Sequence, residues 1–258
     1  MWHSLGAFIK YRLTAKTKYS IHSPFVYHLV TEVLEKDLDK SLAQSLHNYK
    51  AALLQDNDSI EVTDFGAGSR IFKSTRRPVH AIAKHVGISK IKSDFLQKLI
   101  YHFKPKNILE MGTSLGIASA AMAIAYPNAS ITSLEGCPET SKKAQEYFDK
   151  FQLNQIQLVV GEFSSQLPII LKNSDFDFIY FDGNHQKNAT LDYFNQCLPK
   201  AHNDTLFVFD DIHWSKGMEE AWEEIKNHPK TSVCIDLYHL GLVFFKKEQV
   251  AQNFVIRV

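Results

Sequence analysis

The sequence lacks the features of a secreted, membrane-spanning or cysteine-rich protein. Its three cysteines, Cys137, Cys197 and Cys234, are odd in number and widely spaced, which favours reduced thiols over a disulfide framework or a metal cluster. No apolar run approaches the roughly 20 residues of a membrane-spanning helix. The short apolar run Leu5–Ile9 is followed, not preceded, by positive charge, so it predicts no export signal. We therefore expect a cytoplasmic protein with no membrane partner.

The chain also has little net charge, +1 over 258 residues, and 45% of its residues are hydrophobic, as in a soluble globular protein. The charge is unevenly distributed. Residues 1–90 contain 13 Lys or Arg and 8 Asp or Glu, whereas the remaining residues contain 16 and 20. A basic N-terminal part can steer an anionic substrate toward an acidic catalytic part, although an ordinary solvated surface explains the same pattern.

Residues 107–135 have the pattern of a unit that binds a nucleoside cofactor. The apolar run Asn107–Met111 predicts a buried strand, and Gly112–Gly116 predicts a turn whose backbone N–H groups can approach a ligand closely. After an apolar helical run, the predicted strand Ser130–Glu135 ends in an acid that can accept hydrogen bonds from ribose hydroxyls. The two glycines of the turn do not have the G-x-G-x-x-G spacing of dinucleotide sites.

With Glu110 leading the turn, this segment resembles motif I of the class I S-adenosylmethionine-dependent methyltransferases. The resemblance implies that the leading acid helps to hold the amino-acid end of the cofactor, and that the second acid holds its ribose. It also places the residues after the third strand near the adenine. The predicted cofactor-binding residues are Glu110, Gly112, Thr113, Ser114, Gly116, Glu135, Gly136, Gly161, Glu162, Phe163 and Asp182. The alternative is an ordinary glycine turn in an α/β protein.

Strand and helix patterns alternate through the rest of the chain. Predicted strands at 156–160, 176–182 and 205–211 are separated by helices, and the runs 232–237 and 241–245 are close enough to form a hairpin. We expect an α/β, doubly wound, seven-stranded and mostly parallel sheet of the Rossmann-like methyltransferase type. Residues 1–85 are predicted to form an α-helical N-terminal extension with a glycine-rich loop, and residues 86–258 the S-adenosylmethionine-binding domain.

A second acid-led glycine turn, Asp64–Ser69, precedes charged residues and a proline instead of an apolar helix, so it does not predict a second cofactor site. We interpret it as a plain turn or as a loop that folds over the active site. In the second case, Arg70, Arg76 and Arg77 are candidates to bind an anion.

Three acids follow the predicted fourth and fifth strands, at the strand ends where ligands collect in parallel sheets. They are Asp182, Asp210 and Asp211. Three converging carboxylates require a cation, and oxygen ligands with open positions suit Mg²⁺. Alternatively, Asp211 is a helix N-terminal acid and Asp182 a turn former.

The same acids resemble the metal ligands of the catechol and caffeoyl-coenzyme A O-methyltransferase group. The pair after the fifth strand is commonly Asp-Asn there and is Asp-Asp here, as in relatives that methylate sugar or antibiotic hydroxyls. Val86–Ser89 and the helix Lys92–Ile100 resemble the segment before motif I in this group, so the resemblance spans residues 86–246. It implies methyl transfer to a hydroxyl group of a small molecule.

The base that this group commonly has as a lysine is replaced by His185, whose imidazole can accept a proton at neutral pH. The alternative is that His185 only caps the following helix. If Asp182 does not bind a metal ion, it becomes the next candidate base, and His213 is a second-line catalytic candidate. Trp214 is predicted either to line the acceptor pocket or to pack in the core.

Two other function classes remain open. An RNA or protein methyltransferase is favoured by the basic N-terminal part, but the sequence has neither an Asn-Pro-Pro-Tyr-type motif nor a recognisable RNA-binding module. A protein that binds S-adenosylmethionine without catalysis is the third reading. Pairing of two chains through the N-terminal helices is a further hypothesis, which rests on the apolar faces of these helices.

Overall fold

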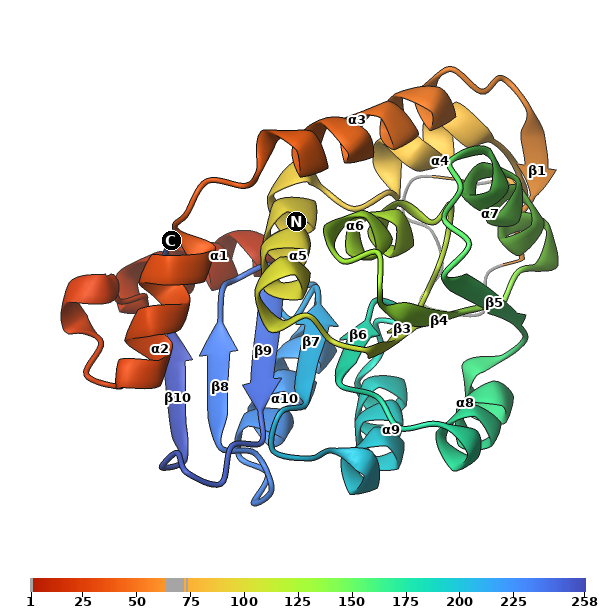
Figure 1. Ribbon diagram of the computed structural model, residues 1–258. Coiled ribbons are helices and arrows are strands. Elements are labelled where there is room, and N and C mark those ends of the chain that lie inside the picture. Colours follow the sequence, from red (N-terminus) through yellow and green to blue (C-terminus); the bar gives the residue numbers. More distant parts are fainter. Residues whose placement is uncertain (1, 64–71, 73) are drawn as a thin grey trace. The chain divides into compact units, whose positions relative to one another are not determined.

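The structure is a computed structural model that describes residues 2–63, 72 and 74–258 (Figure 1). The chain forms two compact units, one of Met1–Lys36 with Leu171–Val258 and the other of Asp37–Ile170. The predicted domain boundary after residue 85 falls inside the second unit. The predicted loop Asp64–Ser69 and Arg70 lie outside the described residues. None of the described helices is long and apolar enough to cross a membrane.

The unit of Asp37–Ile170 contains three parallel strands in the order β3-β4-β5, with the bounds Asn107–Met111, Ser130–Glu135 and Ile156–Val160. The apolar side chains of β3 are fully buried, as expected for a strand that is covered on both faces. The helices are α3 (Lys40–Leu54), α4 (Val79–His85), α5 (Lys90–Phe103), α6 (Ile117–Ala125), α7 (Pro138–Lys150) and the first part of α8 (Phe163–Asn173). A separate antiparallel pair is formed by β1 (Ser59–Glu61) and β2 (Arg76–Pro78).

Side-chain caps fix where several of these helices begin. The Asp39 carboxylate accepts the Ser41 N–H at the start of α3, and the Ser89 hydroxyl accepts the Lys92 N–H at the start of α5. Pro138 occupies the first turn of α7, where its missing N–H costs nothing. These local signals explain where α3, α5 and α7 begin.

The other unit contains five strands in the order β10-β8-β9-β7-β6. Their bounds are β6 Phe178–Phe181, β7 Leu206–Asp210, β8 Val233–Asp236, β9 Leu240–Phe244 and β10 Gln252–Val255. The β8–β9 pair is the predicted antiparallel hairpin, and β6–β7 and β8–β10 are parallel. The helices are α1 (Trp2–Thr14), α2 (Pro24–Leu29) with its π-helical continuation Val30–Leu34, α9 (Lys187–Cys197) and α10 (Lys216–Lys226), with short 3-10 turns at Lys18–Ser20 and Leu198–Lys200.

Helices cover both faces of β9. The Phe25 ring of α2 meets the Phe244 ring edge-on at 5.0 Å, whereas Trp222 of α10 covers Gly241, where an added Cβ would lie 2.8 Å from the indole. Residues 241 and 244 point to opposite faces because side chains alternate along a strand. The α/β prediction is therefore confirmed, with helices on both faces (Figure 1).

The strand count differs from the prediction. Apart from β1 and β2, the described residues form eight strands, β3 to β10, where we predicted a sheet of seven. The additional strand is β10, whose first residues, Gln252 and Asn253, are exposed. It lies beside β8 and is also bound to Lys16, which follows α1. The Lys16 N–H donates to the Val255 carbonyl, and the Arg257 N–H donates to the Lys16 carbonyl.

Candidate active site

The turn after β3 has an unusual backbone. Gly112, Ser114 and Gly116 have φ values of 106°, 49° and 73°, in the region that favours glycine. The N–H groups of Gly112 and Thr113 donate to the Leu134 carbonyl at 2.9 and 3.2 Å. The turn therefore folds against the end of β4, and α6 begins directly after it.

This fold brings the predicted ribose acid to the turn. The Glu135 carboxylate accepts the Ser114 N–H through Oε2 at 2.8 Å and the Cys137 N–H through Oε1 at 2.9 Å. Gly161, at the end of β5, donates its N–H to the Glu135 carbonyl at 2.9 Å. Several predicted cofactor residues, from three different strand ends, thus meet at one edge of the parallel strands.

Glu110 supports the turn from the protein interior. It is fully buried, and its Oε2 accepts hydrogen bonds from the hydroxyls of Ser119 and Ser133, the latter at 2.5 Å. Ser133 also hydrogen bonds to Thr113 Oγ1 at 2.6 Å. The Oε1 atom of Glu110 is buried without a hydrogen-bond partner among the described residues. Sequence reasoning missed both serines, because nothing marks them apart from other small residues of a strand and a helix.

Burial raises the pKa of Glu110 to about 7, against the hydrogen bonds from the two serines, which lower it; the charge of Glu135 adds to the rise. A raised pKa means that the folded state holds this proton more tightly than the unfolded state. Glu110 therefore contributes most to stability below pH 4.5, and that contribution is lost as the pH rises toward 7.

We expect Glu110→Gln to remove this pH dependence. Between pH 4.5 and 8, the unfolding free energy of the variant should gain about 3 kcal/mol relative to the native chain, because 1 pKa unit corresponds to about 1.4 kcal/mol. Urea denaturation at a series of pH values measures the difference. The control is Glu220→Gln, because Lys187 lowers the pKa of this surface carboxyl and its effect should appear only in acid, with the opposite sign. If the unfolding free energies of Glu110→Gln and of the native chain changed with pH in the same way, the expectation would be contradicted.

The predicted metal ligands lie in the other unit. Asp210 is buried, and its carboxylate accepts the Tyr180 hydroxyl at 3.0 Å and the Asp211 N–H at 2.7 Å. Asp211 has a left-handed backbone (φ 51°), and its N–H also donates to the His239 carbonyl at 3.1 Å. Within the described ranges, no group of three or more His, Cys, Asp or Glu side chains is placed to hold a metal ion. The predicted set of Asp182, Asp210 and Asp211 therefore stays a prediction.

Asp182 and His185 lie close together after β6. The His185 Nε2 is 3.8 Å from Asp182 Oδ1, and the His185 ring centroid is 6.3 Å from that of Trp214. Asn184, between them, has a left-handed backbone (φ 51°) that turns the chain back. The structure thus brings a carboxylate, an imidazole and an indole together. The predicted proton acceptor, His185, lies beside the planar side chain of Trp214.

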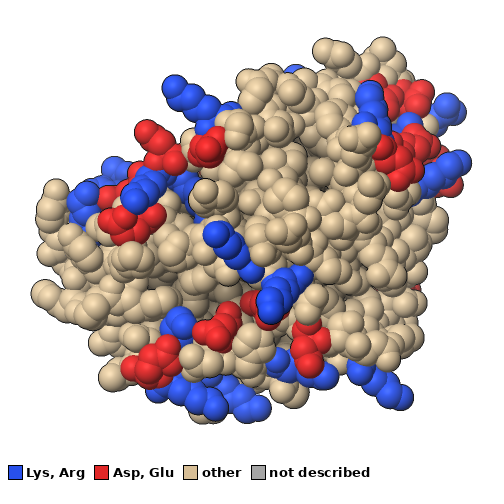
Figure 2. Space-filling view, viewed as in Figure 1, with Lys and Arg blue, Asp and Glu red and all other residues tan. Residues whose placement is uncertain are grey.

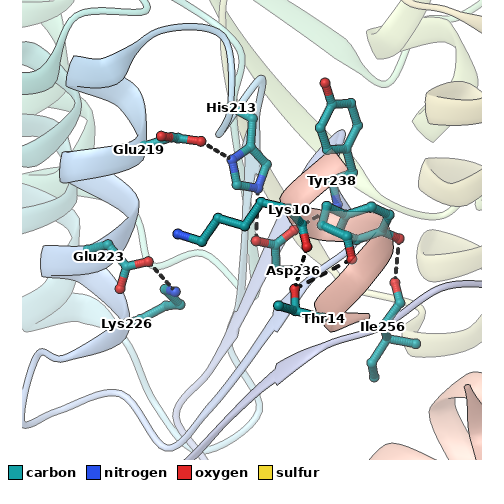
Figure 3. Close-up of polar contacts among 10 residues, drawn as sticks. Lys10, Thr14, His213, Glu219, Glu223, Lys226, Asp236, Tyr238 and Ile256 are labelled. Atoms are coloured by element: carbon teal, nitrogen blue, oxygen red, sulfur yellow. Dashed lines mark hydrogen bonds and ion pairs between the residues drawn. The ribbon is translucent and has the colours of Figure 1, made fainter. Parts of the chain in front are cut away.

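His213 lies between two carboxylates (Figure 3). Its Nδ1 is 2.9 Å from Glu219 of α10 and its Nε2 is 2.9 Å from Asp236 of β8, while its ring stacks on Tyr238 at 5.3 Å. Burial alone would lower the pKa of His213, but the hydrogen bonds and charges of Asp236 and Glu219 outweigh it and raise the pKa. This geometry favours a charged link between α10 and β8, and the second-line catalytic role predicted for His213 stays a prediction.

A glycine turn and an acid that meet at the ends of parallel strands define an α/β protein of the nucleoside-cofactor-binding class. Residues 67–252 match the sequence profile of a family described as O-methyltransferase, and the chain belongs to this family. The predicted resemblance to the O-methyltransferases is thereby confirmed.

Individual relatives agree with this assignment. A catechol O-methyltransferase of Niastella koreensis is 32% identical over 131 residues, which are 49% of this chain and 58% of the relative, so the match spans less than two thirds of that protein. The SAH-bound methyltransferase PaMTH1 of Podospora anserina has 15% identity and a TM-score of 0.60, covering 88% of this chain and 98% of its own. The Bacillus cereus O-methyltransferase in complex with SAH has 20% identity and a TM-score of 0.54, covering 85% and 96%. The two structures share the fold of this chain.

Proposed function

We propose that this chain transfers the methyl group of S-adenosylmethionine to a hydroxyl oxygen of a small molecule. The contact between the β3 turn and Glu135 is the observation that carries the proposal, in a chain of the O-methyltransferase family. In a complex with the cofactor, the Glu135 carboxylate would accept ribose hydroxyls, and the backbone of the turn would approach the ligand. Both solved relatives described above contain S-adenosylhomocysteine, the product of this cofactor.

The bound cofactor supplies an activated methyl group on a sulfonium. The chain must then align the acceptor oxygen, exclude water and take up the hydroxyl proton. We assign the proton to the imidazole of His185, whose Nε2 lies 3.8 Å from Asp182 Oδ1. Trp214 offers a flat apolar surface beside this imidazole for a planar acceptor.

Metal dependence is a finer part of the proposal. The donor chemistry of Asp182, Asp210 and Asp211 suits Mg²⁺, but both oxygens of the Asp210 carboxylate are used within the protein, by Tyr180 and by the Asp211 N–H. Since no group of three such side chains is placed to hold a metal ion in the described part of the chain, no step of the proposed reaction is routed through one. Activity in Mg²⁺ and in EDTA decides whether the predicted requirement holds.

The acceptor is proposed from chemistry and from the relative's name. Catechol, which the Niastella koreensis enzyme is named for, is the first acceptor to test. The expectation of an anionic acceptor rests on the charge excess of residues 1–90. On the face shown in Figure 2, basic and acidic side chains are interspersed, and they gather together over α7 and β1. Neutral and anionic hydroxyl compounds therefore both belong in the acceptor panel. The mass of the protein in solution tests the homodimer hypothesis separately.

Calorimetric titration with S-adenosylhomocysteine, followed by methyl transfer from S-adenosylmethionine to a panel of catechols, phenols and sugars, tests the function. We expect micromolar binding and transfer to at least one hydroxyl. Absence of binding would contradict the proposal. Binding without transfer to any acceptor would favour the non-catalytic reading, and salt-dependent retention of RNA would favour the RNA methyltransferase.

A further inference from the structure

A buried tyrosine from the predicted N-terminal extension reaches the cofactor turn. Tyr49 of α3 is fully buried, and its hydroxyl donates a hydrogen bond of 3.0 Å to the Leu115 carbonyl. Leu115 lies 66 positions after Tyr49 in the sequence and immediately precedes Gly116, the last residue of the turn. Both residues belong to the same compact unit, in which α3 contacts α6, the helix that follows the turn (Figure 1).

The ring of Tyr49 is held in one position by other aromatic side chains. It meets Tyr147 edge-on at 5.9 Å, stacks on Phe148 at 6.4 Å and lies 5.0 Å from Phe151. Gly116 borders the same cluster, because a Cβ at this residue would lie 2.4 Å from the Phe148 ring and 2.9 Å from the Tyr49 hydroxyl. The hydroxyl therefore has little freedom to leave the Leu115 carbonyl.

Because the peptide group is planar, the hydrogen bond to the Leu115 carbonyl fixes the peptide plane between Leu115 and Gly116. This plane in turn restrains the preceding residues of the turn, some of which have a left-handed backbone. The Glu110, Ser133 and Thr113 contacts hold the turn from the sheet side, whereas Tyr49 holds it from the helix side. We infer that Tyr49 is a positioning residue, which pre-organises the turn so that cofactor binding does not have to order it. This inference rests on the proposed function, because it assumes that the turn binds S-adenosylmethionine.

The chain offers a matched control for Tyr49. Tyr147 lies in the same aromatic cluster, but its hydroxyl donates to Asp56 Oδ2 at 2.9 Å and to the Ala52 carbonyl at 3.3 Å, near the end of α3 rather than at the turn. Tyr49→Phe and Tyr147→Phe each remove one hydroxyl and keep the ring. Both should lower the melting temperature, but only the first removes a contact with the turn.

The experiment compares S-adenosylhomocysteine affinity by calorimetry in the native chain and the two variants. We expect the Kd to rise about tenfold, or about 1.4 kcal/mol, in Tyr49→Phe, and to change less than about twofold in Tyr147→Phe. Hydrogen exchange of residues 112–116 should be faster in ligand-free Tyr49→Phe and should return to the native rate at saturation, which a loss of packing alone would not produce.

Equal affinity in the native chain and in folded Tyr49→Phe would overturn the inference and leave the proposed function standing. Equal loss of affinity in both variants would also overturn it, because the effect would then follow general destabilisation. If the native chain does not bind S-adenosylhomocysteine, the proposed function fails first, and the role of Tyr49 fails with it.

Discussion

Replacing His185 by Gln is expected to lower the rate of methyl transfer at least about 100-fold and to leave S-adenosylhomocysteine affinity unchanged. Positioned proton acceptors contribute about 10²- to 10⁴-fold in enzymes, and glutamine cannot take up the proton that imidazole accepts. His185 also lies 3.8 Å from Asp182, so its protonated form has a carboxylate beside it. The expected loss is therefore in kcat and not in cofactor binding.

The measurement is single-turnover transfer of a labelled methyl group to whichever acceptor the panel identifies. His202→Gln is the control, because this histidine is exposed at the surface and lies 3.3 Å from Asp177, which immediately precedes β6. It reproduces the imidazole and carboxylate pair at the opposite end of this strand from Asp182 and His185. We expect the control to keep the native rate. A native rate in His185→Gln would make Asp182 the next candidate base, to be tested as Asp182→Asn.

Replacing Gly116 by Ala is expected to destabilise the fold by about 4 kcal/mol. The backbone φ of 73° disfavours any side chain, at a cost of about 1–2 kcal/mol, and overpacking adds about 1–3 kcal/mol. The added Cβ would lie 2.4 Å from the Phe148 ring and 2.9 Å from the Tyr49 hydroxyl, so the aromatic cluster or the turn must move. Because the turn is the proposed cofactor site, S-adenosylhomocysteine affinity should fall more than about tenfold.

Urea denaturation and calorimetry together measure both effects. Gly217→Ala is the matched control, since Gly217 lies in α10 and an added Cβ there has its nearest neighbour at 3.5 Å, in ordinary contact. Because Gly217 is the second residue of α10, alanine should change the stability of this control by less than about 0.5 kcal/mol. If Gly116→Ala is as stable as the native chain, the turn and the aromatic cluster can shift to accommodate the added methyl group, and the expectation is wrong.

The glycine turn and its meeting with Glu135, which form the candidate cofactor site, could be predicted because their signals are local. Within 29 residues the sequence contains a buried apolar strand, a turn with two glycines and a strand that ends in Glu135. Each of these features can be recognised from its own residues. The contact between Ser114 and Glu135 follows directly from the parallel pairing of β3 and β4. No distant part of the chain was needed to infer it.

The residues that sequence reasoning missed act across long separations. Tyr49 looks like one more apolar position of a helix, and only the folded chain places its hydroxyl on Leu115. Strand β10 was missed for a different reason, because its polar first residues do not alternate with apolar ones and its pairing depends on β8 and Lys16. Such contacts leave no periodic signal in the sequence.

The pairing of the two ends of the described chain also bears on how the protein is made. The Tyr11 hydroxyl donates to the Ile256 carbonyl at 2.6 Å, across 245 positions of sequence, and Lys16 bonds to the residues on both sides of Ile256. During synthesis, α1 is therefore made before the strand β10 that it contacts, whereas the unit of Asp37–Ile170 is contiguous in the sequence. All the strands around the candidate cofactor turn are thus made within one continuous stretch of synthesis, whereas α1 lacks its partner β10 until the last described residues are added.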